Sequence, residues 1–275
     1  MSKTPGTEKR SMFSYFSMGF GQLGKLFSLL GIPFILDLID YGYLLAIPPT
    51  PGTFHIGVKF SLPVALPSVS NFYNFPRPYT GLFYFSFESP IFFSIFIALP
   101  ILFLFMILRA FLVGGYVGSI YETATKTGKE GFLHYARTRF LSLLVFEIIM
   151  FALTIFVMLL VPILFIFPIL MFFIVSYLFY LVPFIIVVDN KDPIAAIRKS
   201  IDYTLKSEAF VFAVVYAIIN AVISFFIHLL MNMWAVGLLL GILIAAYVGT
   251  GLVASTVYFY LDFDSRVRQS APIGF

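Results

Sequence analysis

The sequence predicts an all-α polytopic membrane protein with about six transmembrane helices. Of its 275 residues, 61% are hydrophobic and only 11% are charged, whereas soluble domains carry about 25% charged residues. Apolar runs of roughly 20 residues, the length that crosses a bilayer, follow one another along the chain. They cover residues 26–47, 91–112, 141–160, 163–188, 210–230 and 234–260. We treat residues 1–275 as a single transmembrane domain.

The distribution of basic residues predicts the orientation of these spans. With six crossings, 15 of the 17 Lys and Arg residues fall on one side, and only Lys59 and Arg77 fall on the other. Positive charge concentrates in cytoplasmic segments, so we expect a multi-pass protein of the cell membrane with both termini in the cytoplasm. No short apolar stretch with a cleavage site follows the polar residues 1–10. The first span would therefore act as an uncleaved signal.

Three short amphipathic helices are expected on the cytoplasmic side, at about residues 13–27, 130–140 and 193–205. The third begins at Asp192, a good N-cap, followed by Pro193 at the first helical position. Each helix should lie in the membrane interface with its basic residues toward anionic headgroups. The headgroup-facing residues would be Lys129, Arg137, Arg139, Arg198 and Lys199. The plan is three helical hairpins, each entered through an interfacial helix.

The first hairpin carries an extracytoplasmic insertion at about residues 48–89. Apolar and polar residues alternate over 53–62, and 82–88 is strand-like and aromatic, so we expect a small β-like structure on the outer leaflet. An irregular aromatic loop is the alternative. Within the spans, Pro100 and Pro168 should kink their helices. Val161 and Pro162 should form the turn between the third and fourth spans.

Four ionisable residues inside the spans are the candidate site. Asp37 and Asp40 are three residues apart, so they share one helix face. Intramembrane carboxylates are costly and mark ion or proton pathways, although hydrogen bonding to neighbouring helices is an alternative role. Arg109 and Glu147 fall at similar depth on adjacent antiparallel spans. We predict an ion pair between them, since either charge alone would be costly in lipid.

A stripe of small residues repeats every four positions on the last span. Its members are Gly237, Gly241, Ala245 and Gly249. Small residues let two helix backbones approach closely. The stripe predicts tight packing within the monomer, or alternatively a face between two copies of the chain.

The sequence contains no familiar catalytic or cofactor motif. There is no Cys, and His134 is predicted on the opposite side of the membrane from His55 and His228, so the three cannot share one metal. Residues 19–24 match the dinucleotide fingerprint in letters but lack its βαβ context. We therefore expect no catalytic residue, metal, cofactor or nucleic-acid partner. The expected partners are membrane lipids, a second copy, or another membrane protein.

Residues 182–206, VPFIIVVDNKDPIAAIRKSIDYTLK, are the most specific local pattern. They resemble the span, linker and amphipathic helix of a superfamily of six-span membrane proteins. It includes the membrane domain of glycerophosphodiester phosphodiesterases and many stand-alone archaeal and bacterial proteins. The small residues Gly114 and Gly118 and the ending with Asp262 and Arg266 agree with this pattern. No soluble catalytic barrel follows the spans, so the resemblance implies an architecture and no activity.

These observations favour a non-catalytic integral membrane protein that acts as a scaffold or accessory subunit, or interacts with lipid. A small-solute or ion transporter or channel using Asp37 and Asp40 is the alternative, and a lipid-modifying intramembrane enzyme is third. A polar cavity reaching Asp37 would favour transport, a solid aromatic core the scaffold, and a polar cleft open to lipid the enzyme. Low Cys and Gln contents also suggest a thermophilic archaeal source.

Overall fold

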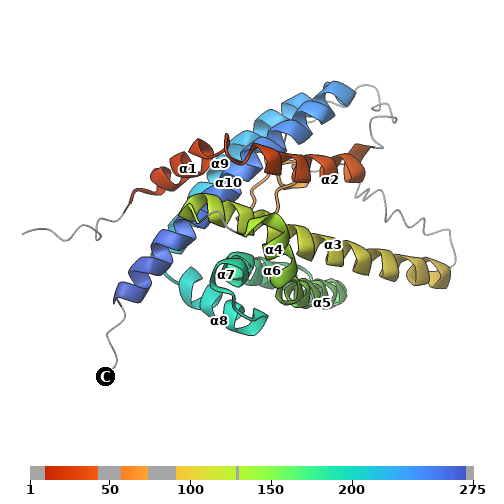
Figure 1. Cartoon of the computed structure of the whole chain (residues 1–275). Coiled ribbons are helices and arrows are strands. Elements are labelled where there is room, and N and C mark those ends of the chain that lie inside the picture. Colours follow the sequence, from red (N-terminus) through yellow and green to blue (C-terminus); the bar gives the residue numbers. More distant parts are fainter. Residues whose placement is uncertain (1–9, 43–56, 74–90, 128–129, 271–275) are drawn as a thin grey trace, which may run out of the picture.

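A computed structural model describes residues 10–42, 57–73, 91–127 and 130–270. Within these ranges the chain is helical and contains no strand (Figure 1). Helices are expected because a backbone in lipid must satisfy its hydrogen bonds internally. The elements are α1 Met12–Gly21, η1 Phe27–Leu30, α2 Gly31–Tyr41, η3 Val69–Asn71, α3 Ile91–Thr125, α4 Gly131–Thr138, α5 Phe140–Leu164, α6 Ile166–Phe179, α7 Val182–Asp189, α8 Pro193–Thr204, α9 Ser207–Met231 and α10 Trp234–Ser270.

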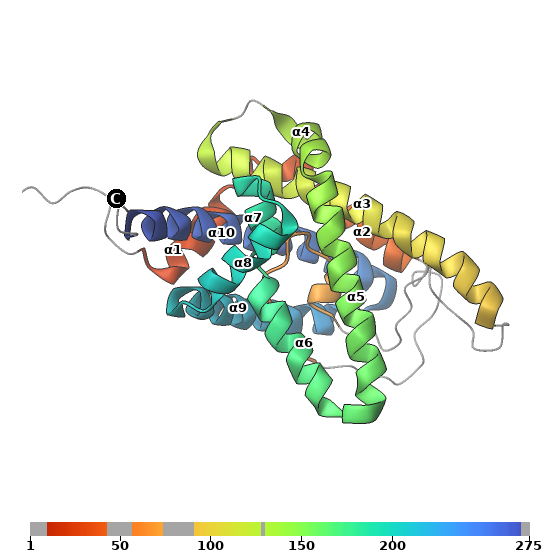
Figure 2. The ribbon, with the colours of Figure 1, turned by 90° about the horizontal axis from the view of Figure 1, so that it is seen from below.

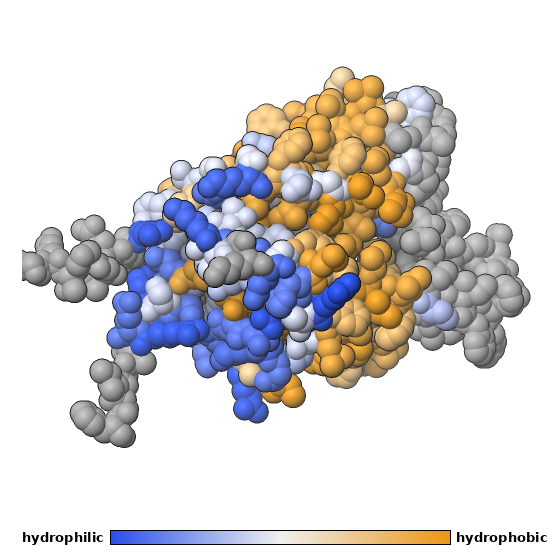
Figure 3. Space-filling model, in the orientation of Figure 1, coloured by the Kyte–Doolittle hydropathy of each residue, from blue (hydrophilic) through white to orange (hydrophobic). Residues whose placement is uncertain are grey.

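The prediction of an all-α membrane protein is confirmed at the level of five candidate spans. In the described residues, five helical segments are long and apolar enough to cross a membrane. They are Leu102–Thr125, Phe140–Leu164, Ile166–Asp189, Ser207–Met231 and Trp234–Gln269. Hydrophobic residues cover a broad part of the surface, while hydrophilic residues gather around α8 and the C-terminal part of α10 (Figure 3).

The segment predicted as the first span, 26–47, is not one long helix in the described residues. It contains η1 and α2. The 11 residues of α2 extend about 16 Å at 1.5 Å per residue, and a bilayer core is about 30 Å thick. Residues 43–56 lie outside the described ranges. Together, α1, η1 and α2 form a broken path that packs across α10 (Figure 1).

Helix α1, which we expect at the membrane interface, packs against α10. Tyr15 and Phe16 are buried. The backbones approach so closely that a Cβ on Gly19 would lie 2.2 Å from the hydroxyl oxygen of Ser255. The reason is the small residues on α10, Gly251 and Ser255, which admit a second backbone where a larger side chain would exclude it.

The α5–α6 hairpin diverges from α9 and α10 (Figure 2) and carries many exposed apolar side chains. Its turn is at Phe165, which has a positive φ of 51°, and not at the predicted Val161 and Pro162, which belong to the last turn of α5. Pro168 lies in the first turn of α6, where a missing N–H costs no helical hydrogen bond. It therefore interrupts no hydrogen bond within α6 and does not produce the predicted kink.

Two other prolines mark helix geometry. Helix α3 continues through Pro100, which lies inside it. The proline removes one helical hydrogen bond but does not end the helix. The fourth predicted span is divided into α6 and α7 at Tyr180 and Leu181, just before Pro183 at the start of α7. The break arises there because Pro183 has no N–H to donate to the carbonyl four residues earlier, and its ring crowds that carbonyl.

The described part of the predicted insertion, residues 57–73, contains η3 and no strand. Residues 48–56 and 74–89, including the segment 82–88, lie outside the described ranges. The alternation of apolar and polar residues in this stretch does not reflect a β-strand. Val58 and Phe60 are exposed on the surface, whereas the backbone of Lys59 is hydrogen-bonded to α9. The exposed apolar side chains of Val58 and Phe60 are compatible with contact to lipid, whereas the backbone of Lys59 contacts polar residues of α9.

The small-residue stripe on α10 packs inside the chain. Ala245 is fully buried, and a Cβ on Gly241 would lie 2.7 Å from the terminal methyl of Met231 at the end of α9. A Cβ on Gly249 would lie 2.3 Å from Pro67 of the 57–73 segment. The stripe thus brings both α9 and this segment close to α10.

Candidate intramembrane polar site

A polar face on α9 holds the segment 57–73, which we call the inner loop. Asn220 donates hydrogen bonds of 2.9 and 3.1 Å to the carbonyls of Lys59 and Asn71. Ser224 accepts a 2.8 Å hydrogen bond from the N–H of Lys59 and donates to the carbonyl of Phe72. Non-helical backbone can therefore lie inside a helical bundle, because its polar groups have partners.

This face follows from the spacing of the residues on α9. Tyr216, Asn220, Ser224 and His228 recur every four residues and are all buried, so they share one side of the helix. The hydroxyl of Tyr216 bonds the backbone of Val64, near the middle of α9. The inner loop therefore extends from the end of α9 to about its midpoint. The sequence prediction missed this face, although polar residues at spacing four in an apolar run could have revealed it.

Asp37 fastens the inner loop to α2. Its side chain is 1% exposed. Its two carboxylate oxygens accept hydrogen bonds of 2.6 Å each, one from the hydroxyl of Ser68 and one from the N–H of Val69. Ser68 also caps η3 in a reciprocal pair with Asn71. Asp37 is thus hydrogen-bonded, but its partners belong to the inner loop and not to a neighbouring span, as the alternative role supposed.

A cavity of about 290 Å³ lies between α2, the inner loop and α3. Its polar lining comprises Asp37, Asp40, Tyr41, Ser68, Ser70, Asn71 and Arg109. Asp40 is only partly exposed and forms no hydrogen bond or ion pair with any residue that the structure describes. The cavity therefore presents one engaged carboxylate and one unengaged carboxylate on the same helix face.

A second cavity, of about 450 Å³, lies between α3, α5, the junction of α6 and α7, and the inner loop. The structure brings Arg109 and Glu147 together here, with 3.1 Å between the guanidinium Nε and a carboxylate oxygen. The Arg109 side chain is 50% exposed and that of Glu147 is 19% exposed. Arg109 and Val64 line both cavities. The four predicted ionisable residues thus surround two adjoining cavities that meet at Arg109.

The cytoplasmic end expected for α10 holds a separate cluster around Lys199. Its ammonium group contacts the carboxylates of Asp189 and Asp264, and Arg268 lies 2.8 Å from Asp264. The hydroxyl of Tyr203 donates a 2.6 Å hydrogen bond to Asp264. Burial, and then this hydrogen bond, raise the pKa of the Tyr203 hydroxyl, so it stays a donor. Lys199 was expected to face lipid headgroups, but its side chain is only 11% exposed because it neutralises two carboxylates.

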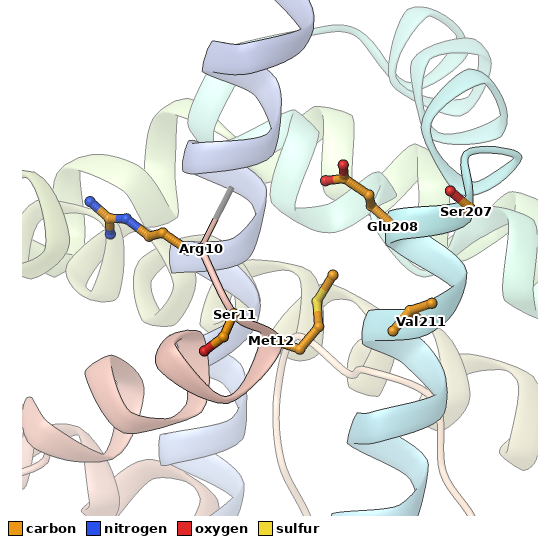
Figure 4. A pocket seen from close by; sticks show the side chains of 6 residues that line it. All are labelled: Arg10, Ser11, Met12, Ser207, Glu208 and Val211. Carbon is orange, nitrogen blue, oxygen red and sulfur yellow. The ribbon is translucent and has the colours of Figure 1, made fainter. Parts of the chain in front are cut away.

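A second cluster occupies another face of α10 and joins it to α1 and α9. Arg266 lies 2.8 Å from Glu208 and 3.0 Å from Asp262, and the hydroxyl of Tyr15 donates a 2.6 Å hydrogen bond to Asp262. A pocket of about 370 Å³ lies beside it, between the starts of α1 and α9. Figure 4 shows Glu208 and Met12 directed into this space. The two clusters lock the ends of α1, α8 and α9 onto α10.

The other predicted headgroup residues differ in their surroundings. Arg137 and Arg198 are exposed. Arg139 is half-buried and donates a hydrogen bond to the side chain of Asn190. Lys129 lies outside the described residues. Only two of the five, therefore, are both described and freely available to lipid.

In the part of the chain that the structure describes, no three His, Asp or Glu side chains are grouped so that they could hold a metal ion. No protein-family model, curated protein or solved structure matches the chain significantly.

Proposed function

We propose that this protein moves a small cation or a proton across the membrane, through the polar region around Asp37, Asp40, Arg109 and Glu147. The observation that carries the proposal is the cavity of about 290 Å³ beside Asp37 and Asp40. Ionisable residues at membrane depth are costly and commonly line ion or proton paths. We therefore rank transport above the scaffold role that the sequence alone favoured.

The charges in this region support a cationic species. Three carboxylates, those of Asp37, Asp40 and Glu147, lie near a single guanidinium, that of Arg109. Asp37 is held by two hydrogen bonds and Arg109 is paired with Glu147. Asp40 is then the carboxylate that can exchange a proton or bind a cation. At about 30 Å³ for each water molecule, the cavity has room for a hydrated species.

The architecture around the cavity also supports the proposal. Broken helices and unwound backbone near the bilayer midplane are typical of transporter binding sites. Here the cavity is bordered by α2, which belongs to a broken path, and by the inner loop. Such backbone is tolerated at membrane depth where it lines a cavity or is buried in protein.

We also propose the finer topology: six crossings arranged as three hairpins, with both termini in the cytoplasm of the cell. The broken path of α1, η1 and α2 would form the first crossing. The Lys and Arg distribution and the resemblance to the six-span superfamily support this arrangement, and the composition supports a thermophilic archaeal source. Because the chain has no Cys, single cysteines can test it. Cysteines at Thr127 and Met233 should be labelled from opposite sides of the membrane.

A scaffold that interacts with lipid is the second candidate, and the packing between α1, α9 and α10 favours it. The ring of Phe212 stacks on those of Phe16 and Phe259 with centroids 5.3 and 4.2 Å apart. Phe263 extends the stack at 5.3 Å from Phe259. This solid aromatic core provides a rigid support, although it lies apart from the cavities.

The test is ion flux into liposomes that contain the purified chain, measured with pH-, Na⁺- and K⁺-sensitive dyes. We expect Asp40→Asn to reduce flux of the transported ion about tenfold or more, because a neutral amide cannot bind a cation or exchange a proton. Asp202→Asn, at an exposed position on α8, is the matched control and should leave flux unchanged. Equal flux in Asp40→Asn and the unmodified protein, or no flux of any of the three ions, would overturn the proposal.

A further inference from the structure

A groove on the surface of α3 borders the cavity beside Asp37 at one residue, Leu108, and otherwise has a lining of its own. It has a volume of about 380 Å³ and lies where α3, the end of α4 and the start of α5 meet. Its lining residues are Leu104, Ile107, Leu108, Phe111, Arg137 and Phe140. Five of these six are apolar, and the single charge comes from Arg137 of α4.

The apolar part of the groove is a straight strip. Its α3 members occur at positions 104, 107, 108 and 111, a spacing that puts them on one helix face over about 10 Å at 1.5 Å per residue. Leu104 is 65% exposed and Leu108 is 44% exposed, so none of the described helices covers the strip. At its Arg137 end, the ring of Phe111 packs edge-on against Phe132 of α4 at 6.4 Å.

Arg137 is exposed and forms no hydrogen bond or ion pair with the described residues. The carboxylates near α4 have other partners. Glu130 lies 3.0 Å from His134, and Glu122 accepts hydrogen bonds from the N–H groups of Glu130 and Gly131. A guanidinium at the end of an apolar strip is thus left without a counter-charge from this part of the chain.

We propose that this groove binds one anionic phospholipid from the leaflet that carries α4. The lipid phosphate would accept hydrogen bonds from the Arg137 guanidinium, whose planar donors match phosphate geometry. One acyl chain would lie along the strip from Phe111 toward Leu104. The charge complementarity and the amphipathic form of the groove identify the ligand as a lipid, since free phosphate would leave the apolar strip uncovered. The proposal is independent of cation movement.

Native mass spectrometry of the full chain can test this site, with phosphatidylglycerol and phosphatidylcholine of identical acyl chains as probes. We expect the unmodified protein to retain one phosphatidylglycerol in preference to phosphatidylcholine. Arg137→Gln should reduce that retention about tenfold, by loss of a charge-assisted contact. Lys25→Gln is the control: it removes an exposed positive charge between α1 and η1, outside the groove, and should leave retention unchanged.

A second variant tests the apolar strip with the charge intact. Leu104→Trp, at a position that lines the groove and neither cavity, should fill the groove and reduce phosphatidylglycerol retention while Arg137 is present. Ile148→Trp, at an exposed position on α5 that does not line the groove, should not. Equal retention of the two lipids by the unmodified protein, or unchanged retention in Arg137→Gln, would overturn the proposal. So would a glycerol phosphate competitor that displaces the lipid, since the site would then recognise the phosphate alone.

Discussion

The backbone N–H of Val69 donates a 2.6 Å hydrogen bond to the carboxylate of Asp37, 32 positions earlier in the chain. This contact joins α2 to the inner loop at the wall of the cavity. Asp37, which lines the proposed ion path, therefore also stabilises the wall of the cavity. Asp40, one turn along the same helix, is the residue at which the two roles can be separated.

Replacing Asp37 should destabilise the fold. Asp37→Ala removes two hydrogen bonds to a carboxylate and leaves the buried N–H of Val69 without a partner, which we expect to cost about 3 kcal/mol. Asp37→Asn keeps one acceptor oxygen and should cost about half as much. The free energy of unfolding can be measured by titration from mild detergent into SDS. Asp202→Ala is the control, and equal stabilities of Asp37→Ala and the unmodified protein would contradict the anchoring role.

Asn220 should be needed to keep the inner loop in place. Asn220→Ala deprives the carbonyls of Lys59 and Asn71 of their donor, with an expected loss of about 1–3 kcal/mol. In a variant with a single cysteine at Ser61, Asn220→Ala should also speed labelling by a water-soluble maleimide. Ile218→Ala removes an exposed side chain from the same helix and should change labelling little. Equal rates in the two backgrounds would refute this prediction.

The pairing of Arg109 with Glu147 should appear in a double-mutant cycle. We expect Arg109→Gln and Glu147→Gln each to reduce stability, and the double variant to lose less than the sum, with a coupling energy of about 1–3 kcal/mol. The physical reason is that each single change leaves the other charge without its 3.1 Å partner. Additive effects would mean that the two groups do not interact in the folded protein.

Lys199 should be the most sensitive position at the end of α10. Lys199→Met leaves the carboxylates of Asp189 and Asp264 facing each other, and loss of one partner from a buried ion pair costs about 3–5 kcal/mol. Because protonation removes the carboxylate charges, the variant should regain stability relative to the unmodified protein as pH falls. Lys25→Met, at an exposed position, is the control. A deficit that is independent of pH would argue against charge repulsion as its cause.

The packing of α1 on α10 can be tested with two neighbouring glycines. Gly19→Ala places a methyl group 2.5 Å from the backbone nitrogen of Ser255 and should cost about 1–3 kcal/mol through overpacking. Gly21 has open space around it, and Gly21→Ala should be neutral or stabilise α1 by up to about 1 kcal/mol. If Gly19→Ala also stabilises the protein, α1 does not pack closely against α10.

Local sequence determined the helical segments. Apolar runs gave four candidate spans that begin close to their predicted starts, while the span predicted at 91–112 corresponds to Leu102–Thr125 among the described residues. Asp192 caps α8 as its position before Pro193 predicted. Even the contact of Arg109 with Glu147 followed from sequence, because their depths in consecutive antiparallel spans could be counted along two helices. These features depend on hydropathy, helical periodicity and capping, each of which acts over a few neighbouring residues.

Tertiary structure alone decided where the irregular and charged parts lie. The contacts of Asn220 with Lys59 and of Lys199 with Asp264 join residues 161 and 65 positions apart, and no local pattern encodes such pairings. Alternation over 53–62 predicted a strand, but in its described part, 57–62, the polar face of α9 supplies hydrogen bonds that a neighbouring strand would have made. Likewise, the packing of α1 on α10 depends on Gly251 and Ser255, which admit the backbone of Gly19 at close range. The sequence specifies the helices through interactions between neighbouring residues. The inner loop and the cavity, in contrast, form only because polar groups far apart in the sequence hydrogen-bond to one another.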